Sequence, residues 1–126
     1  MTAPASTLVF VYGTLKRSGS NHHVLAGQVF VGDARTVPGY ALYDLGAYPG
    51  MVRSADDRDG VAGEVWSVDP AALARLDAFE GVPEKLYRRD GVPLLAPFAD
   101  RSIDAYFYLR TVDGRRSIAG GNWSVA

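Results

Sequence analysis

Glu80 stands at the end of a helical sequence, on the side of the helix that carries apolar residues. In the segment DPAALARLDAFEG, residues 69–81, four apolar side chains recur at the spacing that places them on one face of a helix. They are Ala72, Leu73, Leu76 and Phe79. At about 100° per residue, Glu80 points between the directions of Leu73 and Leu76. A carboxylate on this core-facing side loses hydration on folding, so it requires a partner, a raised pKa or a wet cavity.

Two effects raise the expected pKa of Glu80. Burial favours the neutral carboxyl, and the negative end of the helix dipole disfavours the anion. A carboxyl whose pKa lies above the ordinary value of about 4.3 is a better proton acceptor from an ammonium group. Glu80 is therefore the leading candidate for a general base. The alternative is that it lies in a fraying last turn and only reaches water.

A second candidate site is the turn Tyr12-Gly13-Thr14-Leu15. The apolar run LVFVY, residues 8–12, stops at Gly13. A strand that ends in such a turn can present successive backbone N–H groups to an anion, and Gly13 has no Cβ to block the approach. The pattern is typical of a site for a carboxylate or an oxyanion, although most junctions of this kind are ordinary turns.

Other chemistries find no support in the sequence. In GTLKRSGS the lysine precedes the second glycine, which is the wrong order for a phosphate loop. His22 and His23 are adjacent and would diverge by about 100° on a helix, so no metal site is expected. The chain has no cysteine, and no serine has the small neighbours of a hydrolase nucleophile.

The aromatic strands near the C-terminus leave two interpretations open. Tyr87, Tyr106 and Tyr108 are either walls of a polar cavity or half-buried strand aromatics. Tyr106 and Tyr108 share one strand face, so if one faces a cavity both should. Asp77, at the edge of the apolar helix face, is expected to be a solvated or capping residue without a catalytic role.

Length and composition indicate one soluble domain over residues 1–126, with residues 1–7 as a flexible N-terminus. The 126 residues are 48% hydrophobic and 21% charged, with a formal net charge of −1. This charge gives no overall attraction to nucleic acid or to an anionic membrane. The start MTAPAST lacks a basic signal region, and LVFVY is too short to span a membrane. We therefore expect a cytoplasmic protein with neither nucleic-acid nor membrane partners.

The segments that position these residues are mainly strands. The continuous apolar run at residues 8–12 predicts a strand in the middle of a sheet. Further strands are predicted within residues 28–32, 39–45, 47–54, 60–68, 85–95 and 102–110. Asp69 fits a helix N-cap, Pro70 the first helical position and Gly81 the residue after the end. A short helix is also predicted before Gly27, which together gives a mostly β domain with few helices.

Five segments in this order resemble the γ-glutamylcyclotransferase-like family: FVYGTLKRSGSNHHVL, YPGMV, VAGEVWSVD, ALARLDAFEGVPEKLYRR and AYFYL. The resemblance extends from about Leu8 to Trp123. It implies an α+β fold in which a small mixed sheet closes into a barrel-like core with few short helices. It also places the family's catalytic acid/base glutamate on Glu80. The family's cavity-floor loop falls on Tyr12, Gly13, Thr14 and Leu15. Many relatives have a glycine after Lys-Arg, where this chain has Ser18.

The resemblance implies an intramolecular aminolysis, in which the α-amine of a γ-glutamyl group attacks its own γ-carbonyl and releases 5-oxoproline and an amine. No cofactor is expected. Glu80 would move the protons, and the N–H groups of residues 13–15 would hold either the α-carboxylate or the oxyanion. Tyr87 is a lower-ranked substrate contact, and Lys16 and Arg17 are expected to be a solvated flank.

The expected partner is a small γ-glutamyl molecule, whose amine the sequence does not specify, and the oligomeric state stays open. A domain of the same fold that binds a small acid without catalysis is the alternative.

Overall fold

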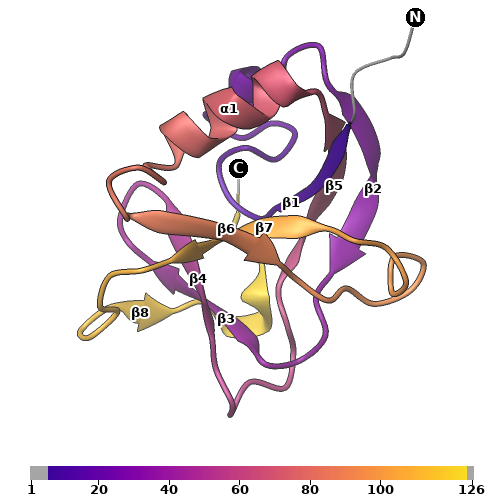
Figure 1. Cartoon of the computed structure of the whole chain (residues 1–126). Coiled ribbons are helices and arrows are strands. Elements are labelled where there is room, and N and C mark those ends of the chain that lie inside the picture. The colour runs from indigo at the N-terminus through magenta and orange to yellow at the C-terminus, as the bar shows by residue number, and fades with distance from the viewer. Residues whose placement is uncertain (1–5, 125–126) are drawn as a thin grey trace, which may run out of the picture.

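The computed structural model describes residues 6–124, which form eight strands, one α-helix and two short 3-10 helices (Figure 1). The strands are β1 (Thr7–Val11), β2 (Val29–Arg35), β3 (Tyr40–Asp44), β4 (Pro49–Arg53), β5 (Ala62–Val68), β6 (Tyr87–Gly91), β7 (Asp104–Tyr108) and β8 (Arg116–Ser117). The helices are α1 (Pro70–Phe79), η1 (His22–Leu25) and η2 (Ala119–Gly121). Every strand predicted from the sequence is present. The two-residue strand β8 was not predicted, because so short a segment has no periodic pattern.

Strand β1 lies in the middle of the larger sheet, as its apolar sequence predicted. The five strands are ordered β2-β5-β1-β7-β6, and β1 is antiparallel to β5 and parallel to β7. Side chains of β1 and of Tyr12, which follows it, pack alternately into opposite layers: Val9 and Val11 into one hydrophobic cluster, Phe10 and Tyr12 into another. All four are buried because both faces of the sheet are covered.

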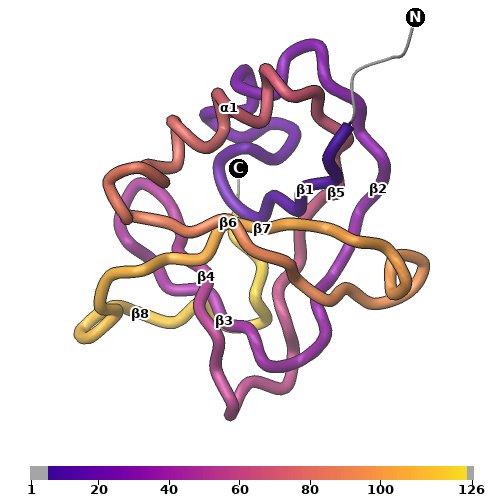
Figure 2. Tube along the Cα trace, viewed as in Figure 1, coloured from indigo at the N-terminus to yellow at the C-terminus, as the bar shows by residue number. Residues whose placement is uncertain are grey.

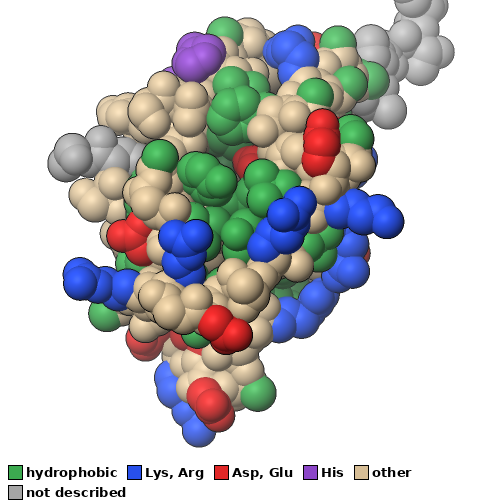
Figure 3. Space-filling model, turned by 90° about the vertical axis from the view of Figure 1, so that its left-hand side faces the viewer, with side chains coloured by type: hydrophobic (Ala, Val, Ile, Leu, Met, Phe, Trp, Pro, Cys, Tyr) green, Lys and Arg blue, Asp and Glu red, His purple; other side chains and the backbone are tan. Residues whose placement is uncertain are grey.

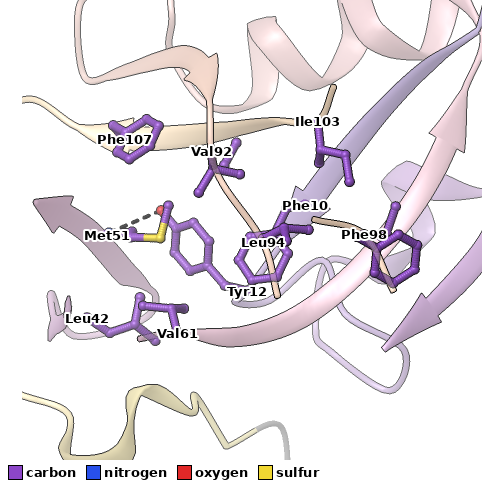
Figure 4. Close-up of a cluster of buried hydrophobic side chains, with 12 residues drawn as sticks. Phe10, Tyr12, Leu42, Met51, Val61, Val92, Leu94, Phe98, Ile103 and Phe107 are labelled. Carbon is purple, nitrogen blue, oxygen red and sulfur yellow. Dashed lines mark hydrogen bonds between the residues drawn. The ribbon is translucent and has the colours of Figure 1, made fainter. Parts of the chain in front are cut away.

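Two different layers cover these faces. Helix α1 lies along one face and buries Ala72 and Leu76 completely (Figures 1 and 2). The other face packs against a three-stranded sheet, β4-β3-β8, which contributes the buried Leu42 and Met51 (Figure 4). The cavity described below lies where the end of α1 meets the loop after β1.

The predicted mixed sheet with few helices is confirmed, but the strands of residues 6–124 do not close into a barrel. Beyond the ends of β2 and β6, one isolated bridge joins Thr36 to Leu94. The residue before Leu94 is Pro93, which has no N–H to extend the pairing. The two sheets therefore pack as layers.

The N-terminal prediction was partly wrong. Thr7 belongs to β1 and pairs with Val68, whereas residues 1–5 lie outside the described part of the chain. In the described residues, no helix has both the length and the apolar character needed to span a membrane.

Candidate active site

All six residues predicted as site residues line one cavity of about 210 Å³. They are Tyr12, Gly13, Thr14, Leu15, Glu80 and Tyr87. Tyr106, for which the sequence left a place in a cavity wall open, lines it as well. The other lining residues were not predicted as site residues: Phe10, Val11, Asn21, Tyr48, Pro49, Phe79 and Leu86. Its walls come from the end of β1 and the following loop, the β3–β4 turn, the end of α1, the start of β6, and β7.

Glu80 is fixed at the end of α1 by its own backbone and by the turn that follows. Its N–H donates to the carbonyl of Leu76, and Gly81 has a φ of +68°. The N–H groups of Gly81 and Val82 donate to the carbonyls of Ala78 and Asp77, which is the Schellman pattern of a helix end. This turn needs a left-handed residue, and Gly81 takes that conformation without strain. The hydrogen bonds argue against a frayed last turn, and Glu80 is only partly exposed, where it lines the cavity.

Burial raises the pKa of the Glu80 carboxyl to about 7, and no other cause contributes. The charge of Glu80 is close enough to three tyrosines to affect them. Burial is the main cause that raises the pKa values of Tyr12, Tyr87 and Tyr106, and the Glu80 charge raises each further. The cavity thus holds one carboxyl that titrates near neutral pH among hydroxyls that stay protonated.

The loop after β1 has backbone N–H groups available for an anion. The carbonyls of Gly13 and Thr14 accept from the N–H groups of Lys16 and Asn21, at 3.1 and 3.0 Å. The side-chain amide of Asn21 also donates to Thr14 Oγ1, at 3.0 Å. Among the bonds found within residues 6–124, none uses the N–H of residues 13, 14 or 15 as a donor. These three consecutive donors belong to residues that line the cavity.

Gly13 is required by a close approach to β4. A Cβ placed on Gly13 would lie 2.8 Å from both Cγ and Cδ of Pro49. The carbonyl of Pro49 accepts a 2.8 Å hydrogen bond from the hydroxyl of Tyr87. Gly13, Pro49 and Tyr87 therefore form one packed wall of the cavity.

The hydroxyl of Tyr12 makes its hydrogen bonds within the protein. The Tyr12 hydroxyl donates to the carbonyl of Tyr106 at 2.7 Å. It accepts from the N–H of Met51 at 3.1 Å (Figure 4). Both partners are main-chain groups, so this side chain ties β1 to β7 and β4. The structure thus gives the Tyr12 side chain a place in the core behind the cavity.

Tyr106 is a cavity residue whose hydroxyl is oriented by Asp77. The hydroxyl donates to Asp77 Oδ1 at 2.7 Å, and Arg89 Nε donates to the same oxygen at 2.9 Å. Arg89 Nη1 donates to Asp104 Oδ2 at 2.8 Å. The prediction of Asp77 as a solvated or capping residue was wrong, because this carboxylate is paired with Arg89. No signal in the sequence linked these residues, which come from α1, β6 and β7.

The expectation that Tyr106 and Tyr108 would both face a cavity if one of them did was also wrong. Both pack against the cluster beneath α1, so they do share a face, but only Tyr106 lines the cavity. Tyr108 packs instead against the ring of Tyr87, with the centroids 5.4 Å apart. Tyr87 pairs with Tyr108 in the sheet, and of the two only Tyr87 lines the cavity.

Lys16 is buried, which corrects the expectation of a solvated flank. Its Nζ donates to the carbonyl of Trp123 at 2.7 Å and to Asn122 Oδ1 at 3.2 Å. Arg17 is half-exposed and pairs with Glu64 and Asp33, at 3.0 and 2.9 Å. Both basic residues therefore anchor the exit of the cavity loop to distant parts of the fold.

Phe79 was predicted on the core-facing side of the helix, but its side chain is 43% exposed. It lies where α1 ends and lines the cavity. The residues that the prediction missed, such as Tyr48 and Leu86, are in turns, where no periodic pattern marks the cavity side. In residues 6–124 no group of three or more acidic, His or Cys side chains is arranged to hold a metal ion.

Comparison with known proteins gives a consistent result. The family described as "Gamma-glutamyl cyclotransferase, AIG2-like" matches residues 9–125. A putative gamma-glutamylcyclotransferase of Vibrio cholerae is 46% identical over 92% of this chain and 94% of its own length. The gamma-glutamylcyclotransferase family protein YtfP of Escherichia coli is 36% identical over 91% of this chain and 94% of its own length. The crystal structure of an AIG2-like protein from Mus musculus superposes with a TM-score of 0.69 and 28% identity, over 84% of this chain and 78% of that one.

The fold is thus that of a small α+β protein, and its cavity holds one carboxyl, that of Glu80, at the end of a helix. The chain is a member of the gamma-glutamyl cyclotransferase, AIG2-like family.

Proposed function

We propose that this protein is a γ-glutamylcyclotransferase that converts a small γ-glutamyl molecule into 5-oxoproline and a free amine. One observation carries the proposal: the Glu80 carboxyl, with a pKa raised to about 7, shares a cavity with residues 13–15, whose N–H groups donate no hydrogen bond found within residues 6–124. A volume of about 210 Å³ is below the roughly 300–1,000 Å³ of sites for drug-sized ligands, which suits a small substrate.

The polar groups of the cavity are either hydrogen-bond acceptors or donors, and this division would determine the orientation in which the substrate binds. The Tyr106 hydroxyl donates its hydrogen to Asp77, so its oxygen can only accept from a ligand. Together with Glu80, it would accept hydrogen bonds from the α-ammonium of the substrate. The N–H groups of residues 13–15 would then hold an anion, either the α-carboxylate or the oxyanion that develops on the γ-carbonyl.

In the proposed reaction, the Glu80 carboxylate takes a proton from the α-ammonium. The freed amine attacks the γ-carbonyl carbon, which forms the ring C–N bond and an oxyanion. Collapse of this intermediate breaks the original γ C–N bond. Two protons pass in total from the attacking nitrogen to the departing nitrogen, and a carboxyl that alternates between base and acid can carry both. Because the reaction is intramolecular, proximity lowers much of the barrier.

The test is release of 5-oxoproline by purified protein from γ-glutamyl amino acids and γ-glutamyl amines. We expect the wild type to release it and Glu80→Gln to be slower by a factor of at least about 10². Glu84→Gln is the matched control, because Glu84 is an exposed residue of the next turn that does not line the cavity. Binding of these compounds by folded protein without any release would instead support the non-catalytic domain.

A further inference from the structure

Large apolar side chains are exposed around the mouth of the cavity. Tyr48 and Phe79 are 39% and 43% exposed, and both line the cavity together with Leu86. Leu109 is also 43% exposed, and its N–H donates to the carbonyl of Leu86 at 3.0 Å. We call these four residues the mouth patch. Figure 3 shows hydrophobic side chains gathered near the middle of one face, with Lys and Arg side chains along their border.

The patch is continuous with the candidate catalytic residues. Phe79 directly precedes Glu80, and Tyr48 directly precedes Pro49 of the cavity wall. Tyr48 also packs against Tyr87, with the ring centroids 6.5 Å apart. Single exposed apolar residues are common, but a cluster at the mouth of a cavity is typical of a ligand-binding surface.

The volume of the cavity determines which part of the substrate reaches this patch. The cavity volume of about 210 Å³ is below the roughly 300–1,000 Å³ of sites that enclose a drug-sized ligand. This space suits the γ-glutamyl group, whose α-amine and γ-carbonyl must both lie near Glu80. A bulky departing amine must then extend outward, across Phe79 and Tyr48.

We propose that the departing amine carries a large apolar group, so that the substrates are γ-glutamyl conjugates of aromatic or large aliphatic amino acids. This inference rests on the proposed function. The apolar group would bury the exposed faces of Phe79, Leu86 and Leu109, which gives a favourable transfer from water. A conjugate with only a small group on its amine would leave these faces in water.

Positive charge at the border of the mouth patch favours a departing amino acid, which carries a carboxylate, over a departing amine that carries a second ammonium group. Arg110 follows Leu109 and donates to the carbonyl of Glu84 at 3.4 Å. Arg115 donates at 3.4 Å to the carbonyl of Leu45, next to the turn that carries Tyr48. Neither arginine is in an ion pair within the described residues. Their positive charge suits the carboxylate of a departing amino acid.

The first test compares 5-oxoproline release from four conjugates: γ-glutamyl-phenylalanine, γ-glutamyl-leucine, γ-glutamyl-glycine and γ-glutamyl-ε-lysine. We expect kcat/KM to be at least about tenfold higher for the phenylalanine and leucine conjugates than for the other two, because a few buried methylenes give discrimination of this size. Equal values, or a preference for the glycine or ε-lysine conjugate, would overturn the proposal.

A matched pair of variants tests whether the mouth patch causes the preference for large apolar groups. Phe79→Ser should reduce the ratio of kcat/KM values for the phenylalanine and glycine conjugates to near one. Leu95→Ser is the control, because Leu95 is equally exposed, at 43%, and does not line the cavity. It should leave the ratio unchanged. Retention of the full preference in Phe79→Ser would refute the role of the patch.

Binding to the Glu80→Gln variant separates this inference from the proposed function. If no conjugate yields 5-oxoproline, the proposed function fails, but calorimetry still compares dissociation constants. We expect the phenylalanine conjugate to bind at least about tenfold more tightly than the glycine conjugate, and this gain to be lost in Glu80→Gln/Phe79→Ser. Equal binding of the two conjugates, or no binding of either, would overturn the inference.

Discussion

The Tyr106 hydroxyl donates a 2.7 Å hydrogen bond to Asp77, across an interface between β7 and α1. Asp77 is held in turn by Arg89 of β6. Since an ion-paired carboxylate only accepts hydrogen bonds, the direction of the Tyr106 hydrogen is fixed, and towards any other group the hydroxyl oxygen acts as an acceptor. Three elements of the fold thus determine the polarity of one cavity wall.

Replacing Asp77 should release the Tyr106 hydroxyl from its fixed orientation. In Asp77→Ala the Tyr106 hydroxyl is free to rotate and to donate, so it no longer acts only as an acceptor for an ammonium group. We expect KM to rise by about tenfold, with a smaller change in kcat, when release of 5-oxoproline is measured. The control is Asp104→Ala, which removes the other carboxylate on Arg89 but leaves the Tyr106 hydrogen bond. An equal change in KM for both variants would contradict this role of Asp77.

The rate of the reaction should depend on pH through Glu80. The Glu80 pKa is about 7 because of burial, so the base form is depleted as pH falls below that value. We expect log kcat/KM to decrease by about one unit for each pH unit below 7. A profile that stays level between pH 5 and pH 8, after correction for substrate ionisation, would exclude Glu80 as the base.

The same pKa predicts how stability changes with pH. The folded pKa of about 7 lies above the ordinary value of 4.5, so the folded state binds the Glu80 proton more tightly than the unfolded state does. The contribution to stability is complete below about pH 4.5 and is lost as pH rises through 7. Relative to wild type, Glu80→Gln should therefore gain about 2 to 3 kcal/mol in free energy of unfolding between pH 5 and pH 8. Urea unfolding at both pH values measures this difference, and a pH-independent difference would count against the raised pKa.

Gly13 should tolerate no side chain. In Gly13→Ala the new Cβ would meet the Pro49 ring at 2.8 Å, and this ring is not the flexible end of a side chain. We expect a loss of about 1–3 kcal/mol in free energy of unfolding and a rise in KM, because Pro49 also holds the Tyr87 hydroxyl. Gly114→Ala, at a position where a Cβ has open space, is the steric control for KM. Unchanged KM and stability in Gly13→Ala would show that the loop can move away from β4.

Local patterns predicted the parts of the molecule that depend on neighbours in sequence. The run at residues 8–12 predicted the central strand, since a strand covered on both faces is apolar at every position. The N-cap Asp69, whose side chain accepts from the N–H of Ala72, and the terminal Gly81 predicted the limits of α1. The angle of Glu80 on that helix indicated a buried carboxyl before any contact was known, and burial does raise its pKa.

Predictions from the sequence pattern were wrong where tertiary contacts changed the environment expected for a side chain. Phe79 has the spacing of a core residue, yet the helix ends at the mouth of the cavity and leaves it exposed. Lys16 has the character of a surface residue, yet the chain brings the carbonyl of Trp123 to its ammonium group. In both cases a segment distant in sequence decided whether the side chain meets water.

The sequence by itself determined strands β1 to β7, the helix with its two ends, and the candidates for a base and for an anion-binding loop. Only the tertiary structure decided that Glu80 and residues 13–15 share one cavity. It also decided that Asp77 orients the Tyr106 hydroxyl, and that apolar side chains surround the mouth of the cavity. The physical reason is the range of the interactions. Helix caps and strand patterns act over a few residues, whereas the cavity is built from contacts such as Tyr106 to Asp77 and Tyr87 to Pro49, which are 29 and 38 residues apart.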